Sequence, residues 1–253
     1  MKAARLLCFL FLASCSVKEA RDSCPCQVAI DLSDFAKVSQ RVRVKVGTER
    51  FQRSLTGEDS LRLQLSIVRG EGSLPVAVWS GLKAMTERDD TVRAQGVNTC
   101  DSLYLFHHAG EDPGENLRLK AVPHKQFASV FLSIQAEPDR EAPSQIRVRS
   151  DSNGLALPDG APVEGTLEIR ADGKGKYHFR LPRQRRSSLI VLEMEGADGL
   201  QKSYPLGEWI LDSGYDWEAE DLDDLVIGMD LAQWDILVEV LPWEAGPLLW
   251  EMF

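Results

Sequence analysis

Hydrophobic and polar residues alternate along much of this chain, which is the pattern of β-strands that bury one face. The run 41–46 shows it most clearly, because three valines fall on one face and three cations on the other. No stretch carries a long 3.6-residue periodicity, and the helical signal is limited to one or two turns at 207–214, ended by Gly214. The other predicted strands are 27–32, 61–65, 76–79, 103–106, 117–121, 127–134, 145–149, 163–169, 176–181, 188–194, 226–231 and 236–241.

Turn-forming residues separate these runs. Glycine, proline and acidic residues gather at 57–59, 70–72, 111–114 and 151–154, and the glycines of 171–175 predict a hairpin between the strands on either side. Many short strands with turns between them are typical of antiparallel β-sandwiches. We therefore predict an all-β protein.

The pattern of alternating strands begins again near Val122 and Pro123, which we interpret as the start of a second domain. A length of 253 residues is comfortable for two domains of ordinary size. We predict an N-terminal β-sandwich at 24–122 and a C-terminal β-sandwich at 123–253.

The first residues have the features of an export signal. Two cations precede an apolar run at 6–12, which is far shorter than the roughly 20 residues that span a bilayer. The Leu-Ala-Ser-Cys sequence that ends at Cys15 resembles the lipobox of bacterial lipoproteins, which implies cleavage before this cysteine and acylation of its thiol and new amine. We predict a signal peptide at 1–14 and a lipidated tether at 15–23 that holds the protein on a membrane. The alternative is an ordinary signal peptide in which Cys15 is a chance residue.

Charge and motifs narrow the function classes. Acidic residues outnumber basic ones by 39 to 29, and a surface this negative repels phosphate backbones, so no nucleic-acid partner is expected. The sequence has no glycine-rich phosphate loop, no His-Glu-x-x-His pair and no Gly-x-Ser-x-Gly elbow. We nominate no catalytic residue and no cofactor, and we do not expect an enzyme.

Three cysteines remain after Cys8 and Cys15 are assigned to the signal and to lipid. Cys24 and Cys26 flank one proline and are poorly placed to bridge each other, so we expect Cys100 to form a disulfide with one of them. The sequence does not choose between the two. A zinc site that uses the nearby His107-His108 pair is a minor alternative, because adjacent histidines on a strand point to opposite faces.

An acidic stretch at 216–224 is dense in the oxygen ligands that calcium prefers. It lacks the glycine that lets an EF-hand loop turn sharply, and a solvated acidic loop is the commoner outcome. The sequence leaves calcium binding at this stretch open, and we assign no metal ligand.

Five of the six tryptophans lie in the last forty-five residues, and only Trp79 stands apart. Exposed aromatic rings stack on sugars, which suggests a glycan as a possible partner. The alternative is that several of these rings fill the second core, as we expect for Trp234. The five are Trp209, Trp217, Trp234, Trp243 and Trp250.

Three successive stretches near the C-terminus resemble one family. The sequences at 205–210, 213–217 and 221–225 are similar to the FimB/Mfa2 family of fimbrial subunits, which are lipoproteins of Bacteroides-type bacteria. The likeness covers nearly the whole mature chain in order. It also includes the lipobox and the segments 24–32, 76–81 and 181–185.

This resemblance implies two tandem transthyretin-like β-sandwich domains, a lipid anchor in the outer membrane and a place at the base of a fimbrium. Family members are anchor or accessory subunits that hold the filament and influence its length, and they are not enzymes. Their partners are pilins, which associate by β-strand complementation, in which one subunit fills a sheet of the next. The apolar segment 247–253 is then either a last sandwich strand or a donor strand. A surface glycan-binding lipoprotein is the alternative function.

Pilins of this type are processed by an arginine-specific protease. Arginines occur early in this chain at Arg41, Arg43, Arg50 and Arg53, and a basic loop occurs at 183–186. Nothing in the sequence shows that any of them is cut.

Overall fold

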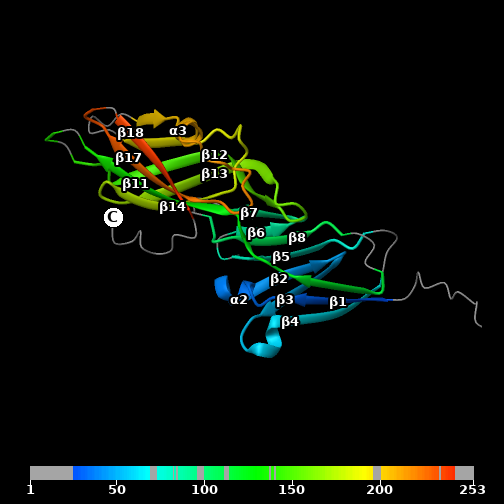
Figure 1. Cartoon of the computed structure of the whole chain (residues 1–253). Helices are drawn as coiled ribbons and strands as arrows, with labels where there is room; N and C mark the ends of the chain where they lie inside the picture. The colour runs from blue at the N-terminus through cyan, green and yellow to red at the C-terminus, as the bar shows by residue number, and fades with distance from the viewer. Residues whose placement is uncertain are drawn as a thin grey trace, which may run out of the picture.

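The alternating runs pair into four β-sheets, which stack as two β-sandwiches in the computed structural model (Figure 1). The structure describes residues 25–68, 73–81, 83, 85–95, 100–110, 114–136, 138–139, 141–195, 201–233 and 235–242. The predicted signal peptide and tether, Cys15, Cys24, Trp234, Trp243, Trp250 and the segment 247–253 lie outside the described residues. No helix within the described ranges is long and apolar enough to cross a membrane.

The first sandwich packs a three-stranded sheet on a five-stranded sheet. The three-stranded sheet has the order β4-β1-β9, and the five-stranded sheet has the order β10-β8-β5-β2-β3. The valines of β2 are buried, as their alternation predicts. The elements are β1 (Pro25–Asp31), α2 (Phe35–Val38), β2 (Arg41–Val46), β3 (Glu49–Ser54), the 3₁₀ helix η2 (Glu58–Leu61), β4 (Arg62–Val68), β5 (Val76–Ser80), β8 (Tyr104–His108), β9 (Asn116–Lys120) and β10 (His124–Lys125).

The second sandwich contains a four-stranded sheet in the order β14-β11-β17-β18 and a larger sheet in the order β16-β15-β12-β7-β6, with β13 on the other edge of β12. The short helix predicted near 207–214 is present, and Gly214 follows it with a φ of 83°. The elements are β6 (Met85–Arg88), β7 (Thr91–Ala94), β11 (Phe127–Gln135), β12 (Gln145–Ala156), β13 (Pro162–Asp172), β14 (Lys176–Pro182), β15 (Val191–Glu195), β16 (Gln201–Tyr204), α3 (Leu206–Asp212), β17 (Asp224–Asp230) and β18 (Asp235–Leu241).

The fold class is confirmed, with one addition to the antiparallel pattern. Among the described strands two pairs are parallel, β1 with β9 and β11 with β17. Each pair joins an early strand of a sandwich to a late one, which fits the long connection that parallel neighbours need. The same arrangement thus recurs in both sandwiches.

Two predicted turns are wrong. The segment 151–154 lies within β12, where two register shifts mark bulges instead of a reversal of the chain. The glycines at 171–175 do not close a hairpin, because β13 pairs with β12 whereas β14 pairs with β11 in the opposite sheet. Turn-forming residues indicate where the chain changes direction, but they do not indicate which sheet the next strand joins.

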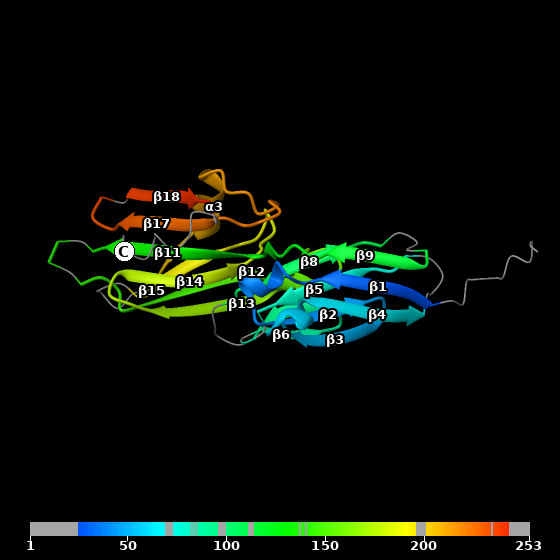
Figure 2. The same cartoon turned by 60° about the horizontal axis from the view of Figure 1, so that its bottom comes forward.

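Strands from each side of residue 122 complete sheets on the other side. The β6–β7 hairpin precedes this position, yet β7 pairs with β12 of the second sandwich. Conversely, β10 follows it and pairs with β8 of the first sandwich. In Figures 1 and 2 the two sandwiches follow one another along the molecule, and the hairpin lies between them in Figure 1. The domain boundary at 122/123 stays a prediction, and these exchanged strands tie the two sides together.

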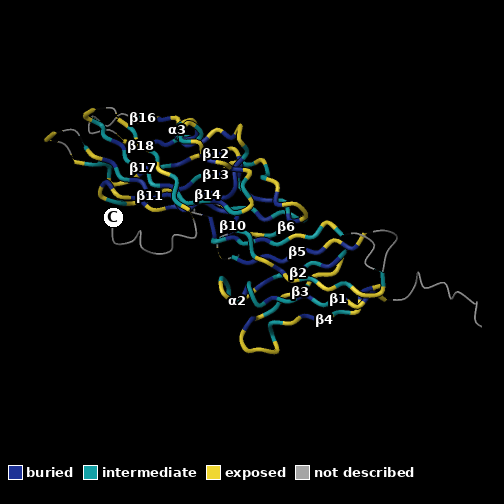
Figure 3. The backbone as a smooth tube through the Cα atoms, in the orientation of Figure 1, coloured by how far each residue is buried: buried dark blue, intermediate teal, exposed yellow. Residues whose placement is uncertain are grey.

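Three apolar clusters form the cores. Figure 3 colours buried residues dark blue, and they occur along the strands of both sandwiches. One cluster fills each sandwich, and the third lies between them around Trp79, Met85, Val92 and Leu155. Strand β5 is therefore buried on both faces: Val76 and Val78 join the first core, whereas Trp79 joins the junction cluster. The junction is thus a packed interface, and it positions the polar groups described next.

Candidate functional site

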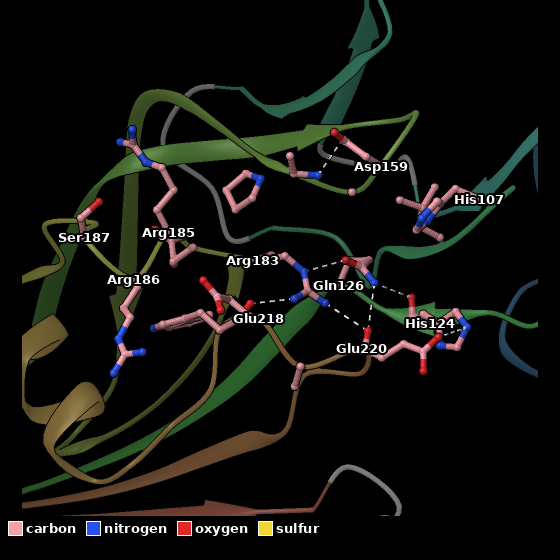
Figure 4. Close-up of a pocket in the computed structure, with 17 residues that line it drawn as sticks. His107, His124, Gln126, Asp159, Arg183, Arg185, Arg186, Ser187, Glu218 and Glu220 are labelled. Atoms are coloured by element: carbon pink, nitrogen blue, oxygen red, sulfur yellow. Dashed lines mark hydrogen bonds and ion pairs between the residues drawn. The ribbon is translucent and has the colours of Figure 1, made fainter. Parts of the chain in front are cut away.

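A cleft of about 750 Å³ opens where the two sandwiches meet (Figure 4). One wall comes from β8 and β10 of the first sandwich and from Gln126, which follows β10. The other walls are three loops of the second sandwich, at 159–162, 183–187 and 217–220. These loops follow different strands, so only the tertiary fold brings their polar side chains together.

Arg183 lies at the centre of the cleft, and only 8% of its surface is exposed to solvent. Its Nε donates to Gln126 Oε1 at 2.8 Å, its Nη1 donates to the Trp217 carbonyl at 2.6 Å, and its Nη2 donates to the Glu220 carbonyl at 3.1 Å. Burial lowers the pKa of this guanidinium, although an arginine stays charged at neutral pH. Arg183 therefore works as a cross-link between the loop after β14 and the acidic loop before β17.

His124 fastens the same acidic loop from the other side. Its Nδ1 lies 3.1 Å from Asp221 Oδ2, and its Nε2 lies 3.1 Å from Glu220 Oε1. The second oxygen of Asp221 accepts a hydrogen bond of 2.6 Å from the backbone N–H of Lys125. These contacts join β10, which is paired with the first sandwich, to a loop of the second.

Lys125 and Asp224 form a buried ion pair beneath this loop. The Lys125 ammonium donates to Asp224 Oδ1 at 2.6 Å and to the Leu222 carbonyl at 2.8 Å, and it lies 4.9 Å from the centre of the Phe127 ring. Burial lowers the pKa of Lys125, and Asp224 acts in the opposite direction. The same oxygen of Asp224 also accepts the Ser129 N–H at 2.7 Å.

The sequence left calcium binding open for the acidic stretch at 216–224. In the structure, carboxylates of this stretch accept hydrogen bonds from the protein itself. Asp221 and Asp224 accept hydrogen bonds from β10 and β11, and Asp216 accepts one from the N–H of Glu218. Within the described part of the chain, no group of three or more histidine, cysteine, aspartate or glutamate residues is placed to hold a metal ion. The observed role of these carboxylates is to fix the loop.

The family-like stretches at 205–225 build the end of the second core. Tyr215 and Trp217 are buried with their rings in edge contact, 4.6 Å between centres, and the Tyr215 hydroxyl donates to the Asp223 carbonyl at 2.8 Å. Burial raises the pKa of Tyr215. Trp209 is half-buried against Tyr204. Of the described tryptophans of this half, Trp217 is thus a core residue and Trp209 packs against the core.

The predicted disulfide of Cys100 with Cys24 or Cys26 stays a prediction, and the structure does not join Cys26 to Cys100. Cys26 and Cys100 are both free, buried thiols, and they lie in different apolar clusters. The Cys100 thiol donates to the Asp101 carbonyl at 3.0 Å, and burial raises its pKa. Sequence spacing could not show that the two cysteines belong to separate cores. The Cys24 alternative involves a residue outside the described ranges.

Two further elements bear on the predicted strand complementation. Among the described strands, β18 is an edge of its sheet, with Ile236, Val238 and Val240 half-buried and Leu237 61% exposed. Strand β9 is likewise an edge of its sheet in the first sandwich, counting the described strands. Edge strands carry backbone groups that a further strand can pair with.

No family model and no curated protein sequence matches the chain. Solved structures do match. The fimbrial anchor protein Mfa2 from Porphyromonas gingivalis aligns over 87% of this chain and 98% of its own length, at 12% identity and a TM-score of 0.57. The fold is that of Mfa2. The resemblance expected from the sequence is therefore confirmed at the level of the fold.

Bacteroides proteins share this fold. A candidate polysaccharide-binding protein from Bacteroides thetaiotaomicron aligns over 87% of this chain and 99% of its own length, with 10% identity and a TM-score of 0.58. A candidate adhesin from Bacteroides ovatus aligns over 90% and 96%, with 12% identity and a TM-score of 0.58. These neighbours carry descriptions of adhesion or binding, not of catalysis.

Proposed function

We propose that the protein is a lipid-anchored fimbrial anchor or accessory subunit of the outer membrane. The observation that carries this proposal is the correspondence with Mfa2, which extends over 98% of that protein and 87% of this chain. A match over both sandwiches and their order is more informative than a match to one sandwich, because single sandwiches host many functions.

The membrane attachment in this proposal rests on Cys15. Two or more acyl chains on this residue give stable anchoring, whereas a single chain holds a protein only marginally. The polar segment 16–23 then acts as a short tether that leaves the first sandwich clear of the lipid headgroups.

The partner in this proposal is a pilin that associates through main-chain pairing. An open edge gains hydrogen bonds when an extended segment adds to it, and alternate side chains of that segment enter the sandwich. The half-buried inward residues of β18 are the kind of surface that such a segment would cover. Holding a filament in this way requires no reactive group, so the proposed role is not enzymatic.

The test is a deletion strain of a fimbriated host. We expect fimbriae to detach into the medium or to change in length, and the wild-type gene to restore them. A Cys15→Ala gene should fail to restore attachment, and mass spectrometry of the wild-type protein should find acyl groups on Cys15. Fimbriae that are unaltered in amount, length and attachment after deletion would contradict the anchor role.

Pilin binding at β18 can be tested by comparing the same substitution at two exposed leucines. Leu237 lies on the β18 edge and is 61% exposed, whereas Leu189 lies in a loop and is 67% exposed. A lysine on an edge strand discourages added strands. We expect Leu237→Lys to reduce co-purification of pilins with the lipoprotein and Leu189→Lys to leave it unchanged. Equal recovery with both variants would move the contact away from β18.

The alternative of a surface glycan-binding lipoprotein has one supporting observation, which is the fold likeness to the Bacteroides thetaiotaomicron protein. Its original basis in the tryptophans is weaker, since Trp209 and Trp217 pack in the second core. A glycan panel titrated against the purified protein separates this function from anchoring, because an anchor role predicts no general affinity for neutral polysaccharides.

A further inference from the structure

The outer face of the β14-β11-β17-β18 sheet, which turns away from the core of the second sandwich, holds an aromatic residue that is almost fully buried. Val130 and Leu132 of β11 belong to that core. Phe131 lies between them in the strand, so its side chain points to the outer face. It is nevertheless only 8% exposed, and it belongs to none of the three apolar clusters that the described residues form. Its burial therefore has a cause outside those cores.

Neighbours in the same sheet explain part of this burial. The His178 ring of β14 stacks on the Phe131 ring, with 4.7 Å between the ring centres and 17° between the ring planes. On the other side of β11, Val226 of β17 pairs with Phe131. Side chains of one sheet stand side by side on its face, so they cover the flanks of a ring and leave its far end open. An exposure of only 8% at this position therefore indicates a segment that lies across the face.

Apolar side chains continue on this face from Phe131 to the end of β18. Val240 packs against the core, so Leu241, the last residue of β18, points to the outer face and is half-buried there. Leu237 points the same way and is 61% exposed. In Figure 2, β18, β17 and β11 lie side by side on the upper side of the second sandwich. A run of apolar side chains on a sheet face is typical of a surface that another segment covers.

The chain itself contains a segment that can reach this face. Residues 247–253 follow β18 and lie outside the described residues. Glu239 of β18 is in line with Phe131, and it lies two residues before the end of the strand. Phe131 is therefore about 10 Å across the sheet and about 7 Å along it from Leu241, or about 12 Å in all. Residues 242–246 extend to roughly 17 Å, which is enough to bring the segment 247–253 over Phe131.

The sequence of this segment suits an extended conformation with one apolar side. Leu248, Trp250 and Met252 fall on one side of an extended chain. The opposite side carries Pro247, Leu249, Glu251 and Phe253. Glu251 is the only residue of the segment with an ionisable side chain, and its carboxylate belongs in water. The side without a charge is therefore the one that matches the apolar face of the sheet.

We propose that the segment 247–253 crosses the outer face of this sheet, with its uncharged side against Phe131 and Val226. The segment then neither extends the sheet beyond β18 nor fills a sheet of a partner, and the β18 edge stays open. The proposal does not rest on the anchor function. It gives the segment the role of shielding an apolar surface that would otherwise favour association between copies of the protein.

The first experiment is photo-cross-linking of the purified full-length protein, with Val226 replaced by p-benzoylphenylalanine. We expect irradiation to join this position to a peptide from 247–253, identified by mass spectrometry. The control places the same photoreactive residue at Glu168 of β13, which lies between two core residues and points outward from the opposite sheet. Cross-links from Val226 that contain no residue of 247–253, or equal capture of this segment from Glu168, would overturn the proposal.

Isotope labelling separates the chain's own segment from that of a second copy. A mixture of ¹⁵N-labelled and unlabelled protein should give cross-links within single chains. Cross-links between labelled and unlabelled chains would assign the face to a second copy and contradict the proposal.

Two further measurements distinguish a covering segment from an added strand. Removal of 247–253 should increase the binding of the apolar dye ANS and leave amide exchange in β18 unchanged, because the segment forms no ladder with that strand. Faster exchange along β18 without a gain in dye binding would instead show edge pairing.

Point variants in the full chain carry the test if the shortened protein does not fold. Leu248→Gln should abolish most of the cross-link from Val226, whereas Leu249→Gln makes the same change on the opposite side and should preserve it. Equal cross-linking of the two variants would overturn the orientation and the proposal with it. Attachment of fimbriae is not measured in any of these experiments, so their outcome is separate from that of the anchor role.

Discussion

Glu87 on β6 and Arg43 on β2 form an ion pair of 2.7 Å that crosses from one sandwich to the other. Arg50 of β3 also pairs with Glu87, and Lys45 pairs with Asp90 at 2.6 Å. The β6–β7 hairpin thus meets the first sandwich through carboxylates while its backbone pairs with the second. Two of the cations that alternate with the buried valines of β2, Arg43 and Lys45, therefore contact the hairpin that completes the other sandwich.

Removing the charge of Glu87 should weaken this junction. Its carboxylate is only 8% exposed, whereas the two arginines are more than 40% exposed, so the loss is moderated by solvent. We expect Glu87→Gln to lower the free energy of unfolding by about 1–2 kcal/mol in urea denaturation. Glu58→Gln, on exposed η2, is the matched control and should change little. Equal stability of both variants would mean that the ion pairs contribute nothing.

Asp90 gives the same junction a pH dependence. The hydrogen bond and charge of Lys45 lower the pKa of Asp90 below its ordinary value. A carboxyl whose folded pKa is depressed adds stability above its unfolded pKa, near ~3.9, and that stability is lost as the pH falls through the folded pKa. Asp90→Asn should therefore be less stable than wild type at neutral pH, by no more than ~1 kcal/mol because the group is partly exposed.

The difference between Asp90→Asn and wild type should disappear as the pH falls below ~4. Asparagine suits this position, because Asp89 and Asp90 both have positive φ, 48° and 58°, in the two-residue turn between β6 and β7. The substitution thus tests the charge without straining the turn. Unfolding curves measured between pH 3 and pH 7 check it, and a difference that is constant with pH would show that charge is not the cause.

Ser80 and Ser152 offer a comparison of unpaired and paired buried hydroxyls. The Ser80 Oγ has no partner in the described residues, whereas the Ser152 Oγ lies 2.8 Å from the Ser188 Oγ. Leaving a buried polar group unpaired is costly, so Ser80→Ala should be neutral or more stable by up to ~1 kcal/mol. Ser152→Ala should lose about 1 kcal/mol, because it removes the hydrogen bond between the two hydroxyls and leaves the Ser188 Oγ with only the Arg185 N–H as a partner. Thermal unfolding of the two variants, each compared with the wild type, measures this difference in stability.

Substitution of Arg183 should destabilise the protein more than substitution of Arg186. Three acceptors from two segments surround the Arg183 guanidinium, and a lysine cannot reach all of them from one nitrogen. We expect Arg183→Lys to cost about 2 kcal/mol and to increase proteolysis of the acidic loop. Arg186 is exposed and has no described hydrogen bond or ion pair, so Arg186→Lys should leave both unchanged. If Arg183→Lys is as stable and as resistant to proteolysis as the wild type, the loop is held by its apolar residues alone.

The sequence predicted local features well because they depend on local pattern. The burial of the β2 valines follows from alternation, and the end of α3 at Gly214 follows from its positive φ. Features that depend on distant neighbours were missed. Nothing local in β5 shows that Trp79 faces another sandwich, and nothing in 183–187 shows that Arg183 is buried. The cleft likewise joins loops separated by dozens of residues.

Gly154 explains why a turn was predicted within β12. Glycine after Asp, Ser and Asn usually marks a reversal, but here a Cβ would overlap with the Val92 carbonyl oxygen of the neighbouring β7. The residue is a glycine because two backbones approach closely where the hairpin joins the second sandwich. Composition alone does not distinguish this cause from a turn.

Gly154→Ala should therefore disrupt the junction. The methyl group forces β7 away from β12, and overpacking of this kind costs about 1–3 kcal/mol. We expect that loss in urea denaturation, together with faster amide exchange in β7. Gly228→Ala on β17 is the control, because its nearest contact would be 3.9 Å away at Ser133, and it should be neutral or slightly stabilising. If the two alanine variants are equally stable, the close approach of β7 to β12 is not what holds the hairpin in place.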